Sequence, residues 1–186
     1  MQYQKDKFIN AALYFAKHTN PRKLGITKLV KLLFYADFLH YEKYGRPIIG
    51  DVYFHLPEGP VPTISYDLFK KTFFQKDGKT GLEEFMKVSP EQIGGGKKFH
   101  KIEPLKEYNR DVFSESDLEI MTEVSAKFYE STGTGLAEKT HEIPFVKNTP
   151  KVFPIEYTDA IEDEADKKYL SELQEEDDEV EGTINH

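Results

Sequence analysis

The chain of 186 residues contains no cysteine and no tryptophan. The absence of cysteine excludes a disulfide framework, a thiolate metal site and a cysteine nucleophile, and it fits a reducing compartment. Long apolar runs are also missing, because no stretch approaches the ~20 apolar residues that a membrane-spanning helix needs. The N-terminal residues lack the apolar core of a secretory signal. We therefore expect a cytoplasmic protein that does not associate with a membrane.

The chain does contain enough apolar material for one domain, together with an uneven distribution of charge. Apolar residues make up 38% of the sequence, and phenylalanine and tyrosine together account for 25 residues. From Glu156 to the C-terminus there are 13 acidic residues and two lysines, a net charge of −11, whereas residues 1–155 carry +3. We predict a folded domain over residues 1–155 and an acidic tail over residues 156–186 that is partly helical or disordered.

Hydrophobic periodicity predicts an α+β fold, in which a mainly helical body surrounds a buried central helix and carries a small antiparallel sheet. The central helix is expected at about residues 26–44, because this stretch is apolar on nearly every side. Gly45 suits its C-cap, since glycine tolerates the left-handed backbone conformation. Further helices are expected at 4–18, 63–75 and 136–141 and from Ser114 onward, and strands within 48–56 and at 84–88 and 97–102.

Two polar residues of the central helix, Asp37 and His40, are three positions apart and therefore share a face. Such a pair could act as a general base. A buried carboxylate must be paired, however, and this favours a structural role in which Asp37 accepts N–H groups of a neighbouring turn. The expected partners are Arg46 and the turn at residues 59–62.

A metal site receives little support from the spacing of acids and histidines. Glu138 and His141 have the i, i+3 spacing of one half of a di-iron site, but the second Glu-x-x-His motif is missing. No Gly-rich loop suits a nucleotide. We expect neither a metal nor another cofactor, and we expect His141 to be a satisfied side chain near Pro144 and Phe145.

The acidic tail has two interpretations, which the sequence leaves open. It is either a solubilising segment or a segment that folds onto a basic protein partner. The candidate partner contacts are Tyr66 and an apolar stripe within a possible helix at 159–174, formed by Ile161, Ala165, Tyr169 and Leu173. Lysines interleaved with aromatic residues suggest DNA binding, but a net charge of +3 is too small to indicate it alone.

Three runs of the sequence occur in a characteristic order: YADFLHYEKYGRPI, GDVYFHLPEGPVP and GLAEKTHEIPF. Together they resemble the Panacea domain, a phage-associated domain of GepA-like and SocA-like proteins, over roughly residues 5–150. Phe145 stands where tryptophan is common in that family. The residues that carry the resemblance are Asp37, His40, Gly45, Arg46, Pro47, Gly59, Pro60, Pro62, Glu138, His141 and Pro144.

The resemblance implies the antitoxin half of a toxin–antitoxin pair, which binds its toxin directly. Combined with the acidic tail, it implies a cognate protein toxin with a basic surface. Some relatives resemble adaptors that pass a toxin to a protease. The alternatives are such an adaptor, a regulator that binds DNA at its own operator, and a hydrolase using Asp37, His40 and His141. The family supplies no catalytic residues to carry over, and we expect a protein that is not an enzyme.

Overall fold

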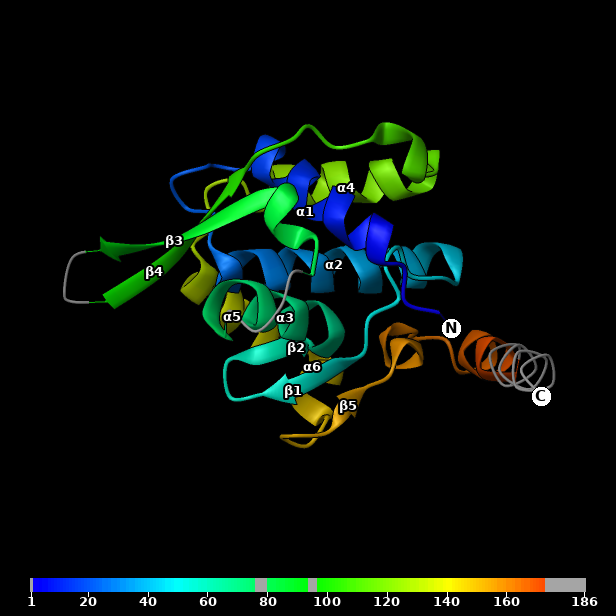
Figure 1. Cartoon of the computed structure of the whole chain (residues 1–186). Coiled ribbons are helices and arrows are strands. Elements are labelled where there is room, and N and C mark those ends of the chain that lie inside the picture. The colour runs from blue at the N-terminus through cyan, green and yellow to red at the C-terminus, as the bar shows by residue number, and fades with distance from the viewer. Residues whose placement is uncertain (1, 76–79, 94–96, 173–186) are drawn as a thin grey trace, which may run out of the picture.

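The computed structural model describes residues 2–75, 80–93 and 97–172. It confirms the α+β fold with a helical body and small antiparallel sheets (Figure 1). Helix α2 (Ile26–Tyr44) runs through the middle of the body, with α1 (Lys5–His18) and α4 (Glu115–Lys127) on one side. On its other side lie α3 (Thr63–Phe69), α5 (Gly133–His141), α6 (Pro144–Asn148) and the small sheet formed by β1, β2 and β5.

Helix α2 has the predicted bounds because its sequence is apolar almost all round. Leu29, Leu33 and Phe34 are fully buried and contribute to two adjoining hydrophobic clusters. The helix ends at Gly45, whose φ of +68° is left-handed and whose N–H donates to the carbonyl of Tyr41. This is the C-cap that the sequence predicted.

The helices α4 and α5 begin at hydroxyl caps. The hydroxyl of Ser114 accepts the N–H of Asp117, whose carboxylate accepts the N–H of Ser114, so the two residues form a capping box. Thr132 accepts the N–H of Gly135, and α5 therefore begins at Gly133, earlier than the predicted residue 136. The glycine-containing run at 132–135 thus starts a helix, whereas α4 already ends at Lys127, with Phe128 as its C-cap.

The two sheets are small and antiparallel. Strand β1 (Tyr53–Leu56) lies between β2 (Gly59–Pro62) and β5 (Pro154–Ile155). Strands β3 (Met86–Ile93) and β4 (Lys97–Pro104) form a separate hairpin that projects from the body (Figure 1), longer than the pair predicted. The helix predicted at 63–75 is α-helical only to Phe69, and residues 70–75 continue as a π-helix.

The beginning of the predicted tail packs against the body. A 3-10 helix, Tyr157–Ala160, stacks the Tyr157 ring against Phe38 and Tyr41, at centroid distances of 4.7 and 5.4 Å. The next helix covers residues 164–172, because the carboxylate of Asp163 accepts the N–H groups of residues 165 and 166.

The helix predicted at 159–174 therefore began too early. Ile161 precedes the helix rather than lying on it, so it does not belong to the predicted stripe. Leu173 lies outside the described residues, and the division of the chain at residue 156 stays a prediction. Over the part of the chain that the structure describes, no helix is both long and apolar enough to cross a membrane.

Candidate functional site

Asp37 is completely buried on α2, and four donors reach its carboxylate. The backbone N–H groups of Ile48 and Ile49 donate to Oδ1 at 3.0 and 2.7 Å. The hydroxyls of Tyr53 and Tyr157 donate to Oδ2 at 3.1 and 3.0 Å. Asp37 therefore connects α2 with the turn that follows it, with β1 and with the 3-10 helix at 157–160.

The contacts of Asp37 confirm the predicted bracing of backbone N–H groups but not the predicted partners. Because the chain turns back after Gly45, the N–H groups of Ile48 and Ile49 point at the carboxylate. The guanidinium of Arg46 instead donates to groups of α4 and its cap. Over the described residues, the turn at 59–62 donates no hydrogen bond to Asp37 either.

The buried site makes Asp37 easier to protonate than an exposed aspartate. Burial raises its pKa to about 6, and hydrogen bonds from Ile49, Tyr157 and Tyr53 only partly oppose the rise. Because the pKa is raised in the folded state, this group contributes most to stability below its unfolded pKa. That contribution decreases as the pH rises through about 6.

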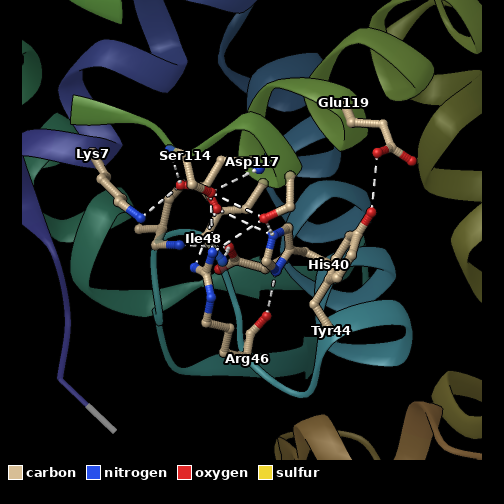
Figure 2. Close-up of polar contacts among 11 residues, drawn as sticks. Lys7, His40, Tyr44, Arg46, Ile48, Ser114, Asp117 and Glu119 are labelled. Carbon is tan, nitrogen blue, oxygen red and sulfur yellow. Dashed lines mark hydrogen bonds and ion pairs between the residues drawn. The ribbon is translucent and has the colours of Figure 1, made fainter. Parts of the chain in front are cut away.

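A second buried carboxylate, Asp117 on α4, contacts three basic side chains (Figure 2). The Lys7 ammonium lies 2.7 Å from Oδ2, and His40 Nε2 and Arg46 Nη1 lie 3.1 and 3.2 Å from Oδ1. The backbone N–H of Ser114 donates to Oδ2 at 3.0 Å. Asp117 thus connects α4 with α1, with α2 and with the turn after α2.

His40 belongs to the network of Asp117 and not to that of Asp37. Its Nδ1 donates to the carbonyl of Arg46 at 2.6 Å, and its Nε2 also lies 3.1 Å from the hydroxyl of Ser116. The imidazole is fully buried, as is Asp37. The two residues share a helix face, but their side chains form hydrogen bonds with different partners. They therefore do not form the general-base pair that the sequence suggested.

The pKa of Asp117 is moved in the direction opposite to that of Asp37. Burial by itself raises the pKa of Asp117, but hydrogen bonds from His40, Lys7 and the N–H of Ser114 outweigh it. They hold the pKa of this carboxyl well below its usual range. Asp117 is therefore an ionised centre of a cationic cluster, whereas Asp37 accepts hydrogen bonds from neutral donors.

A buried lysine lies where α2 meets β2. The side chain of Lys31 is fully buried, and its ammonium donates to the carbonyl of Pro60 at 2.7 Å. Gly59 beside it has a φ of +89°, and a Cβ there would lie 2.6 Å from the Thr140 hydroxyl and 3.1 Å from the Lys31 ammonium. Both the backbone conformation and the close approach require glycine at this position. Burial lowers the pKa of Lys31 to about 7.

We predict that the stability contributed by Lys31 increases with pH. Because its pKa is lowered from 10.5 to about 7 in the folded state, the unfolded chain binds more protons between these values. From pH 7 to pH 9 the unfolding free energy of the natural chain should rise by about 1–2.5 kcal/mol relative to the variant Lys31→Met. Urea unfolding of both proteins measures the difference. Lys147→Met, on an exposed lysine, is the control, and parallel profiles for the natural chain and Lys31→Met would contradict the prediction.

His141 belongs to a third polar cluster, with His55 and Lys151. The Nδ1 of His55 donates to the carbonyl of Thr149 at 2.7 Å, and the Nε2 of His141 donates to the carbonyl of Pro57 at 3.1 Å. The remaining ring nitrogens accept from the Lys151 ammonium at 2.6 and 3.4 Å. His141 is satisfied, as expected, and Glu138 is exposed to solvent. Among the described residues, no group of three or more histidines and acids is placed to hold a metal ion.

The residues predicted to contact a partner differ in accessibility. Tyr169 is 61% exposed on the helix at 164–172. Tyr66 and Ile161 are half-buried, and the Lys70 ammonium lies 5.4 Å from the centre of the Tyr66 ring. Tyr169 is therefore the most accessible of the candidate partner contacts within the described residues.

Three contributors to the buried networks were not singled out from the sequence. Asp117 showed only the spacing of a capping box, Lys7 was one of many lysines, and Tyr157 lay in the predicted tail. The sequence signals of buried charge were Asp37, Lys28 and Lys31, which lie inside a helix that is apolar on nearly every side. The other contacts depend on how α1 and residues 157–160 pack onto α2.

The comparison with protein families agrees with the motifs. A family model described as Antitoxin SocA-like, Panacea domain, matches residues 29–144. This range contains all but the first three residues of α2, together with Asp117 and the turn at 59–62, and it ends before the acidic segment. No curated protein and no solved structure matches the chain.

Proposed function

The chain belongs to the family of SocA-like antitoxins with a Panacea domain, and we propose that it neutralises a cognate protein toxin by binding it directly. The family match, which covers more than half of the chain, carries this proposal. The toxin is expected to present a basic surface, because the segment after residue 155 has a net charge of −11.

The buried networks support a binding role over catalysis. A catalytic acid or base must reach its substrate, yet Asp37 and His40 are both 0% exposed. Every donor and acceptor of these two side chains is directed at a protein partner. These residues hold α2, the turn at 45–50, β1 and α4 together, so that the exposed surface keeps one shape.

Co-expression with the product of the adjacent gene tests the proposal. We expect that product alone to stop growth, and we expect growth to return when this chain is made at a similar level. A stable complex of the two purified proteins should form in size-exclusion chromatography. If the adjacent product is harmless, or if it still kills in the presence of this chain, the proposal is wrong.

A second measurement separates occlusion of the toxin from its delivery to a protease. With purified toxin and purified chain and no protease present, occlusion predicts that the toxin's activity falls as the chain is added. An adaptor would leave that activity unchanged until a protease is supplied. We expect inhibition without a protease.

A further inference from the structure

A groove with a volume of about 400 Å³ lies between the end of α2 and the segment at residues 161–170. The wall from α2 includes Glu42 and Tyr44, and the opposite wall includes Glu162, Asp166 and Tyr169. Figure 1 shows the last described helix on the side of the molecule where α2 ends. One wall of the groove thus lies within the residues matched by the family model, and the other wall lies beyond them.

Both walls of the groove are fixed to the body. On the α2 side, the hydroxyl of Tyr44 donates to Glu119 at 3.0 Å, and its ring lies 4.8 Å from that of His40 (Figure 2). On the other side, the half-buried ring of Tyr157 anchors the chain just before residue 161. Leu170 then comes within 3.1 Å of the position that a Cβ would take at Gly45. The groove is therefore preorganised, which reduces the entropy lost on binding.

The lining of the groove combines exposed rings with uncompensated negative charge. Tyr44 is 43% and Tyr169 is 61% exposed. Within the described residues, Glu42, Glu162 and Asp166 have no ion-pair partner, whereas the one lysine of the groove, Lys43, pairs with acids of α4. The carbonyl end of the α2 dipole adds to the same negative potential.

We propose that this groove binds a lysine- or arginine-rich segment of the partner protein, with its cationic groups on the carboxylates and its aliphatic stems on Tyr44 and Tyr169. This inference rests on the proposed function and names the surface that performs it. A cationic side chain satisfies both features of the groove at once, because it pairs with carboxylates and also stacks on aromatic faces. An acidic or purely apolar segment would leave the carboxylates facing it unpaired.

The charged and the aromatic residues of the groove should have different roles in binding. Exposed charges at the edge of an interface mainly accelerate association, whereas aromatic residues at its centre mainly slow dissociation. The carboxylates of Glu162 and Asp166 should therefore govern the association rate and its dependence on salt. The ring of Tyr169 should govern the lifetime of the complex.

Binding kinetics of the full-length chain with the purified toxin from the adjacent gene test this assignment. We expect the double variant Glu162→Lys, Asp166→Lys to lower the association rate about 10- to 100-fold in dilute buffer. Raising the salt concentration should diminish this difference, because the charges are exposed. We expect Tyr169→Ser to increase the dissociation rate about tenfold, the loss typical of a moderate hot-spot residue.

Matched variants control for total charge and for exposed tyrosine. Asp111→Lys, Glu142→Lys makes the same charge change at two exposed acids away from the groove, and Tyr129→Ser removes a ring that is 45% exposed. If the groove and control variants bind equally well, the groove does not contact the partner, although the antitoxin role stands. If the unaltered chain binds no toxin, the proposed function fails and the role of the groove fails with it.

Discussion

Replacing Asp37 with alanine is expected to lower the free energy of unfolding by about 3–5 kcal/mol. The carboxylate accepts from two backbone N–H groups and two tyrosine hydroxyls in a fully buried site. Tyr157 can retain its bond to the carbonyl of Asp51 at 2.8 Å, but the N–H groups of Ile48 and Ile49 cannot rotate to other acceptors. Their desolvation therefore remains without compensation. Urea unfolding monitored by circular dichroism measures the loss.

The variant Asp37→Asn separates the role of the acceptor from that of the charge. The side-chain amide keeps one oxygen for the backbone N–H groups, so we expect a smaller loss of about 1–2 kcal/mol. The raised pKa of Asp37, about 6, adds a pH dependence. Because the natural side chain loses part of its stabilisation as the pH rises through this value, the difference between the two proteins should be smaller at pH 8 than at pH 5.

Exposed Asp166 provides the control for this series, and Asp166→Ala should change stability by less than about 0.5 kcal/mol. A catalytic role for Asp37 predicts a different pattern, in which Asp37→Asn abolishes an activity and leaves the melting temperature unchanged. An unchanged melting temperature in Asp37→Ala would show that the four hydrogen bonds do not hold the turn, β1 and residues 157–160 onto α2.

The parts of the fold that follow from local sequence were predictable. The bounds of α2 follow from an apolar sequence without periodic interruption and from a glycine at position 45, where the backbone must turn left-handed. The capping box at residues 114–117 and the pairing of β3 with β4 are also determined by residues that are close in the sequence. Each of these features is decided within a few residues along the chain or across one hairpin.

The parts that depend on distant packing were not predictable. Tyr157 lies 120 positions from Asp37, and nothing near it in an acidic segment indicates that its hydroxyl donates to that carboxylate. Arg46 follows a turn that aims it at α4, so its partner is Asp117 and not Asp37. The sequence therefore predicted that a buried acid would need hydrogen-bond donors, but it did not predict which residues supply them.

The second buried acid, Asp117, contacts three basic side chains that are far apart in the sequence, and no local motif predicted this cluster. Two of its three basic partners are well shielded from solvent: His40 is 0% exposed, and the side chain of Lys7 is 15% exposed. Arg46 is 46% exposed, so water can solvate its guanidinium if the carboxylate is lost. The three contacts should thus contribute unequally, because exposed ion pairs add only ~0–1 kcal/mol.

We predict that Asp117→Ala lowers the free energy of unfolding by about 3–5 kcal/mol, because it leaves buried basic groups unpaired and removes part of the α4 cap. Arg46→Ala should cost only about 1 kcal/mol, since its pair is half exposed. Because the pKa of Asp117 is lowered in the folded state, its stabilisation is present above the unfolded pKa and is lost as the pH falls below it. The variant Asp117→Asn should therefore lose less stability than the natural chain between pH 5 and pH 2.5 in urea unfolding. Equal losses for Asp117→Ala and Arg46→Ala would contradict the prediction, because they would show that the shielded contacts of Asp117 with His40 and Lys7 add no stability beyond its exposed contact with Arg46.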